Sequence, residues 1–130
     1  MTSTAVVSGG HTGLGLETVR SIAASGHFSD IVVASRDLER ATQALGDVHP
    51  RRSRVHTARL DLGSLASIRD FPAALGTLGL PPVGALVCNA GVQIVEGTRF
   101  TVDGFEETFA VNVLGHFLLT KLLLDRMGAG

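Results

Sequence analysis

The stretch from Ser8 to Gly15 reads Ser-Gly-Gly-His-Thr-Gly-Leu-Gly, and it joins an apolar run at residues 4–8 to an amphipathic segment. Gly9 permits a tight turn, Gly13 lets the backbone approach a pyrophosphate, and Gly15 allows close helix–strand packing. The helix that follows offers free N–H groups and the positive end of its dipole. We therefore predict a Rossmann-type βαβ unit whose turn holds a dinucleotide. A glycine-rich connection without a ligand is the alternative. The expected contacts are Ser8, Gly9, His11, Thr12, Gly13, Leu14 and Gly15.

Apolar runs of strand length alternate with segments of helical period along the whole chain, as in parallel α/β folds. Strands are expected at residues 4–8, 31–35, 54–60 and 83–88, and helices at 14–26, 37–45, 64–78 and 104–127. Right-handed crossovers predict the strand order 3-2-1-4. The expected fold is one doubly wound parallel sheet over residues 1–130, truncated after strand four and its long helix, with an open edge on strand four. The residues expected to face the core are Leu14, Val19, Ile22, Ala23, Leu38, Ala41, Leu45, Leu65, Ile68, Phe71, Leu75, Leu78 and Cys88.

The end of the second strand bears on the choice between NAD(H) and NADP(H). An NAD site carries an acidic residue there, whereas this chain has Ser35-Arg36. A guanidinium can pair with a 2′-phosphate through two charge-assisted hydrogen bonds. Ser35 and Arg36 therefore favour NADP(H). The alternative is a solvated arginine at the start of a helix.

Four motifs in order make the chain resemble the N-terminal half of a short-chain dehydrogenase/reductase. The glycine turn matches with serine in place of the usual threonine, Asp61-Leu62 matches the adenine-contacting pair, and Cys88-Asn89-Ala90-Gly91 matches the Asn-Ala-Gly element. The segment from Val111 to Phe117 matches the one that holds the family's catalytic asparagine. Residues 36–41, 60–65 and 115–119 are most similar to the retinol dehydrogenase and protochlorophyllide reductase branch.

The resemblance implies cofactor contacts from Asp61, Leu62, Asn89, Ala90 and Gly91, and a catalytic Asn112 that holds a water in a proton relay. The residues allow other roles as well. Asp61 could instead cap the next helix, and Asn89 could tie neighbouring loops together. Asn112, between two valines of a helix, could be a hydrogen-bonded core residue.

Catalysis in the resembled family uses a serine and a Tyr-x3-Lys pair, yet this chain has no tyrosine. We expect the NADP(H)-binding portion of an oxidoreductase that transfers hydride between nicotinamide and a carbonyl, alcohol or activated double bond, inactive as this chain alone. A truncated chain, a fragment and a chain that relies on another polypeptide all remain open. The alternative function is a non-catalytic NADP(H)-binding or protein-interaction module. The substrate and reaction direction are not encoded in this stretch.

Composition narrows the expected partners. A net charge of -1 gives no electrostatic reason for a nucleic-acid partner, and the single Cys88 together with a start lacking a secretion signal favours the cytoplasm. The five histidines show no metal-ligand spacing, and residues 114–124 are too short for a membrane span. Two apolar stripes on the helix at 104–127 predict burial against the sheet and against a partner. The resemblance implies that this helix packs in an oligomer interface, so we expect a homo-oligomer or association through it. One stripe is Phe105, Phe109, Val113 and Phe117, and the other is Leu114, Leu118 and Leu122.

Overall fold

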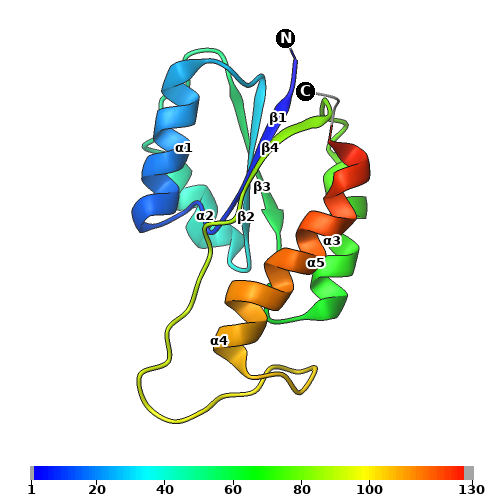
Figure 1. Ribbon diagram of the computed structural model, residues 1–130. Coiled ribbons are helices and arrows are strands. Elements are labelled where there is room, and N and C mark those ends of the chain that lie inside the picture. The colour runs from blue at the N-terminus through cyan, green and yellow to red at the C-terminus, as the bar shows by residue number, and fades with distance from the viewer. Residues whose placement is uncertain (1, 128–130) are drawn as a thin grey trace.

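The computed structural model describes residues 2–127 and contains a four-stranded parallel sheet between two layers of helices (Figure 1). The strands are β1 (Thr4–Ser8), β2 (Asp30–Ser35), β3 (Arg54–Arg59) and β4 (Val83–Val87), in the order β3-β2-β1-β4. This confirms the predicted order. Helices α1 (Gly13–Ser25) and α2 (Leu38–Leu45) cover one face, and α3 (Leu65–Thr77) and α5 (His116–Leu123) cover the other.

Successive residues of β2 supply the two faces of the core. Val32 and Ala34 pack with α3 and α5, whereas Ile31 and Val33 pack with α1 and α2. Because helices cover both faces, every residue of β1 and β2 is buried. This explains why these strands read as continuous apolar runs. The carboxyl ends of all four strands meet at one edge of the sheet.

The last helical segment differs from the single helix expected at residues 104–127. It consists of α4 (Glu107–Phe109), a π-helical turn η1 (Ala110–Gly115), α5 and a 3₁₀ turn η2 (Leu124–Arg126). Its start is later because Gly104 has a φ of 82° and Glu106 caps the first turn. The N–H groups of Phe109 and Thr108 donate to the Glu106 carboxylate and lower its pKa.

Seven expected core residues are less buried than predicted. Leu14, Leu38, Leu78 and Cys88 are exposed, and Ile22, Leu45 and Leu65 are half-buried. Each lies in the first or last turn of its helix, at the cap of a helix or just past a strand. Helical period shows which face is apolar but not where the opposing surface ends.

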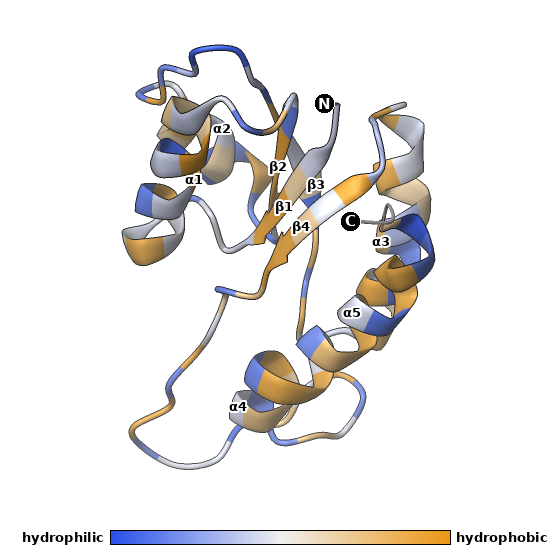
Figure 2. Cartoon of the chain, turned by 45° about the horizontal axis from the view of Figure 1, so that its top comes forward, coloured by the Kyte–Doolittle hydropathy of each residue, from blue (hydrophilic) through white to orange (hydrophobic). Residues whose placement is uncertain are grey.

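The segment from Glu107 to Arg126 is long and apolar enough, by length and composition alone, to cross a bilayer. Hydrophobic residues follow most of α4 and α5 (Figure 2). Leu119 and Leu123 are fully buried in the core against the sheet and α3, and Leu118 and Leu122 pack against it. A core helix of a globular protein passes the same test, so the segment is weak evidence for a membrane span.

Candidate functional site

A cavity of about 580 Å³ opens at the carboxyl ends of the four strands. In open α/β sheets this is the edge where ligands bind. It brings together most of the residues that the sequence singled out: Gly9, His11, Thr12, Gly13, Leu14, Ser35, Arg36, Asp61, Leu62, Asn89, Ala90 and Gly91. Ser8, Gly15 and Asn112 do not line it, and the first two are buried beneath its wall.

The glycine turn leaves room for a ligand at Gly13 and none at Gly15. Gly13 has a φ of 53°, and a Cβ there would meet no protein atom within 4 Å. A Cβ on Gly15 would overlap the Gly9 carbonyl oxygen and the Asn89 side-chain amide. The Thr12 side chain makes no capping hydrogen bond, so the first N–H groups of α1 stay available to an anion.

Asn89 ties the glycine turn to the loop after β4. Its Nδ2 donates to the carbonyl oxygens of Ser8 and Gly9, both at 3.2 Å. The Ser8 Oγ in return accepts from the N–H groups of Asn89 at 3.0 Å and Ala90 at 3.1 Å. The loop-tying role considered for Asn89 is thus what the structure shows, and the same residue also lines the cavity.

Positive charge lies where the cavity meets the end of β2. Arg36 is exposed, and Arg59 of β3 donates to its carbonyl oxygen at 2.8 Å. Within residues 2–127 neither Arg36 nor Arg40 is in a salt bridge. The His11 Nδ1 lies 3.2 Å from the Ser35 Oγ, which connects the glycine turn to this corner. The corner therefore offers two guanidinium groups, an imidazole and a hydroxyl to a ligand.

Asp61 serves the turn that leads into α3. Its Oδ1 accepts from the Gly63 N–H at 2.9 Å, and its own N–H donates to Ser67 at 2.9 Å. The capping residue of α3 is Ser64, whose hydroxyl accepts from the Ser67 N–H. The capping role considered for Asp61 therefore falls to Ser64, whereas Asp61 itself lines the cavity.

Asn112 is exposed, which corrects the view of it as a residue buried between two valines. Its amide pairs with the backbone of Val92, accepting from the N–H at 2.8 Å and donating to the carbonyl at 2.9 Å. The π turn brings Asn112 to this loop, and π turns often occur at functional sites. Gly115 lets the same turn approach the connection between β3 and α3, because a Cβ there would lie 2.6 Å from the Leu62 carbonyl oxygen.

Sequence reasoning missed several residues of the cavity wall. Asp37 caps α2 directly after Arg36, and Arg40 lies in the first turn of α2, four residues after Arg36, so that spacing could have predicted them. Val92 and Val111 come from a loop and a helix, and no local pattern indicates that they meet. Across residues 2–127 no group of three His, Cys, Asp or Glu side chains is placed to hold a metal ion.

Comparison with known proteins agrees with this geometry. A family model for short chain dehydrogenase matches residues 3–130. The chain belongs to this family. Chloroplastic protochlorophyllide reductase of Chlamydomonas reinhardtii is 43% identical over 124 residues, which are 94% of this chain and 31% of that protein. Human retinol dehydrogenase 13 is 41% identical over 128 residues, which are 97% of this chain and 38% of that protein.

A solved structure shares the fold of this short-chain dehydrogenase chain. The Pseudomonas aeruginosa RhlG/NADP active-site complex superposes with a TM-score of 0.76 at 26% identity, over 95% of this chain and 47% of that one. The two relatives above are a protochlorophyllide reductase and a retinol dehydrogenase, which is the resemblance that the motifs indicated. The chain spans about a third of the length of these relatives.

Proposed function

We propose that the chain binds NADP(H) and supplies the cofactor-binding part of an oxidoreductase. The observation that carries this is the cavity at the strand ends, into which the open space at Gly13 and the uncapped start of α1 both face. Gly9, His11, Thr12, Gly13 and Leu14 would hold the pyrophosphate and adenosine ribose. In that arrangement Ser8 and Gly15 shape the turn from beneath. The RhlG complex, which contains NADP, supports the choice of ligand.

The remaining walls would hold the other parts of the cofactor. Asp61 and Leu62 would contact the adenine, and Ser35 and Arg36 would bind the 2′-phosphate. Asn89, Ala90 and Gly91 would lie along the nicotinamide ribose. The cofactor supplies hydride chemistry when it is bound. The chain's own residues orient it and offer Asn112 beside the reaction space, where the Asn112 side chain already holds the Val92 loop.

Arg36→Asp should weaken NADPH binding by about 10- to 100-fold, because the variant loses charge-assisted bonds and places a carboxylate against the 2′-phosphate. NADH binding should be unchanged or tighter, since a carboxylate can accept from a free 2′-hydroxyl. The enhancement of reduced-nicotinamide emission on binding measures the affinities for NADPH and for NADH. A chain without tryptophan or tyrosine contributes little background fluorescence. Arg52→Asp, at an exposed arginine in the loop before β3, is the matched control.

Two results would count against the proposal. Equal loss of NADPH and NADH affinity in Arg36→Asp would contradict a 2′-phosphate role. No binding of either cofactor by the folded wild-type chain would reject the cofactor site as a whole.

Hydride transfer by this chain alone should stay at background. A short-chain dehydrogenase needs a proton donor or acceptor matched to its pH, and the chain has no phenol to serve. NADPH oxidation in the presence of small carbonyl substrates measures this at saturating cofactor. Turnover that depends on the protein would show that another group moves the proton.

A non-catalytic NADP(H)-binding or interaction module is the second candidate. The observation that favours it is an exposed stripe of Phe105, Phe109, Val113 and Phe117. Within residues 2–127 the β4 edge of the sheet carries only a single bridge, between Val83 and Met127. In this proposal the stripe takes a second copy or another protein rather than a nucleic acid. If the chain is instead the cofactor-binding part of an oxidoreductase, the stripe packs within a complete enzyme that acts on a small molecule. For either we propose the cytoplasm, because Cys88 is a single exposed thiol.

A further inference from the structure

His116 is a buried histidine to which neither the cofactor site nor the proton relay gives a role. It begins α5 and is 8% exposed, directly above the end of β1. Its Nε2 lies 2.8 Å from the Ser8 Oγ, and its Nδ1 lies 3.4 Å from the Asn112 carbonyl oxygen. One side chain thus connects the π turn to Ser8, the residue that opens the glycine turn and lies 108 positions before His116 in the sequence.

The protons around Ser8 decide which ring nitrogen carries hydrogen. The Ser8 Oγ accepts from two N–H groups, those of Asn89 and Ala90, which occupy both of its lone pairs. Its own proton must therefore be donated, and the two acceptors in reach are His116 Nε2 at 2.8 Å and the Val87 carbonyl at 3.4 Å. The shorter contact makes Nε2 an acceptor. The ring proton then sits on Nδ1, facing the Asn112 carbonyl.

The surroundings of the ring favour this uncharged form. The polar groups that contact it are the Ser8 hydroxyl from β1 and the Asn112 carbonyl from η1, and the Val87 carbonyl at the end of β4 lies 3.4 Å from the Ser8 Oγ. On its own helix Thr120 donates to the backbone carbonyl of His116, and the Thr120 hydroxyl lies 3.9 Å from the Cys88 thiol. Burial lowers the pKa of His116, and its contact with Asn112 only partly offsets this.

We propose that His116 is a positioning residue for the cofactor site: as the neutral Nδ1–H tautomer it orients the Ser8 hydroxyl, which holds the Asn89–Ala90 wall. This rests on the proposed NADP(H) site. A protonated ring could not accept from Ser8, and its Nε2–H would compete with the two backbone donors. One of the Asn89 and Ala90 N–H groups would then lose its acceptor, and the wall that lines the cavity would loosen.

The tautomer can be tested without a ligand. Long-range ¹H–¹⁵N correlation spectra of the labelled 130-residue chain near neutral pH should show Nδ1 protonated and Nε2 unprotonated at His116. The signal is assigned by its loss in His116→Gln. The opposite tautomer, or a protonated ring, would overturn the proposal whether or not the chain binds NADP⁺.

Affinity for NADP⁺, measured calorimetrically, tests the coupling to the site. A glutamine carbonyl reaches as far as Nε2, whereas an asparagine reaches only as far as Nδ1. His116→Gln should therefore stay within about 3-fold of wild type near neutral pH, and His116→Asn should bind about 10-fold more weakly, as should Ser8→Ala. Equal affinities for the Gln and Asn variants would overturn the proposal.

The pH dependence of NADP⁺ affinity tests the proposal even if His116→Asn fails to fold, because it compares only wild type and His116→Gln. Wild-type affinity should fall relative to His116→Gln as the pH falls through the lowered pKa of His116, because at position 116 only the imidazole gains a proton. The 2′-phosphate of NADP⁺ titrates equally in both measurements and cancels from their ratio. His49→Gln, at an exposed histidine, should follow wild type. A constant ratio between wild type and His116→Gln down to the acid limit of the folded state would overturn the proposal.

Discussion

Gly15→Ala is expected to abolish NADP(H) binding, with a loss of at least about 100-fold, and to lower the free energy of unfolding by about 1–3 kcal/mol. The added Cβ would overlap the Gly9 carbonyl oxygen and the Asn89 Nδ2, and it would lie 3.0 Å from the Gly9 carbonyl carbon. Two of these atoms are backbone, so the turn itself must open. Opening it also breaks the bonds from Asn89 to Ser8 and Gly9.

The measurement pairs NADPH titration with urea unfolding followed by far-ultraviolet circular dichroism. Gly26→Ala is the matched control, because Gly26 ends α1 with a φ of 68° and a Cβ there meets nothing within 4 Å. Gly26→Ala should lower the free energy of unfolding through backbone strain alone and leave the cofactor affinity unchanged. A Gly15→Ala chain that binds NADPH as wild type does would contradict the packing described for the turn.

Gly13→Ala should impair cofactor binding while the protein stays folded. A Cβ at Gly13 would point into open space toward the cavity, so the protein should remain folded at the cost of a strained φ of 53°. The methyl group would then stand where the pyrophosphate must approach. The two glycines therefore have different tasks, and only Gly15 is required by the protein itself.

Local patterns were sufficient to predict the sheet. The apolar runs predicted the bounds of β1 to β4 to within one residue, and the handedness of parallel crossovers predicted their order. The glycine turn was predicted because its spacing and its place between strand and helix both have a steric cause. Ser64 and Gly26 were identified as helix ends for similar local reasons.

Contacts between distant segments could not be predicted in this way. The π turn has no residue preference that separates it from an α-helix, so the pairing of Asn112 with Val92 was not foreseen. His116 belongs to a segment that carries the family resemblance, but the sequence predicts no contact for its side chain, and its bond to Ser8 depends on how α5 crosses the end of β1. Leu14 fits a helical stripe but extends past the sheet edge.

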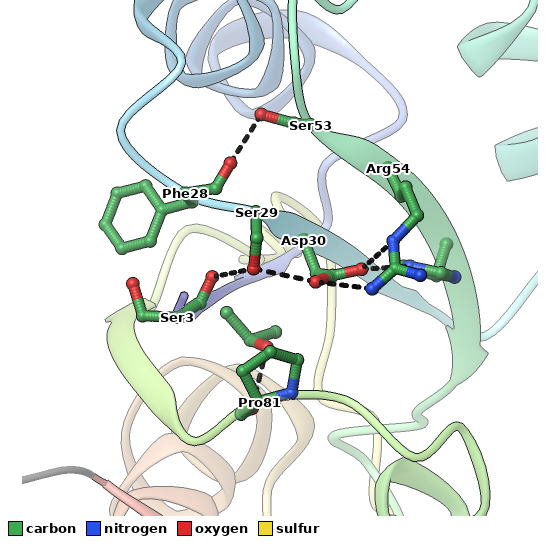
Figure 3. Close-up of polar contacts among 9 residues, drawn as sticks. Ser3, Phe28, Ser29, Asp30, Ser53, Arg54 and Pro81 are labelled. Carbon is green, nitrogen blue, oxygen red and sulfur yellow. Dashed lines mark hydrogen bonds and ion pairs between the residues drawn. The ribbon is translucent and has the colours of Figure 1, made fainter. Parts of the chain in front are cut away.

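Asp30 was also missed, since the second strand was expected to begin one residue later. It lies at the amino end of β2, opposite the cavity, and its side chain is fully buried. Each carboxylate oxygen receives two donors (Figure 3): Oδ1 from Arg54 Nε at 2.9 Å and His56 Nε2 at 2.8 Å, and Oδ2 from Arg54 and Ser29. The cluster joins β2 to β3 at this end of the sheet.

Asp30→Asn should lower the free energy of unfolding by about 2–3 kcal/mol at neutral pH. In either orientation of the asparagine amide, its NH₂ group faces two hydrogen-bond donors from which it cannot accept. The loss is smaller than for a fully buried ion pair, because the Arg54 side chain is 69% exposed and can turn to water. Asp47→Asn, at an exposed carboxylate, should change stability little.

The pH profile tests the charge rather than the shape of the side chain. Burial alone would raise the pKa of Asp30, but the bonds from Arg54, His56 and Ser29 outweigh it and hold the pKa below its ordinary value of 3.8. The native state then binds fewer protons than the unfolded chain, so this stabilisation is present above that value and is lost as the pH falls through the lower native pKa. Wild type and Asp30→Asn should therefore converge in acid, as measured by urea unfolding across the pH range. Parallel profiles would show that the carboxylate charge contributes nothing and that the loss comes from packing alone.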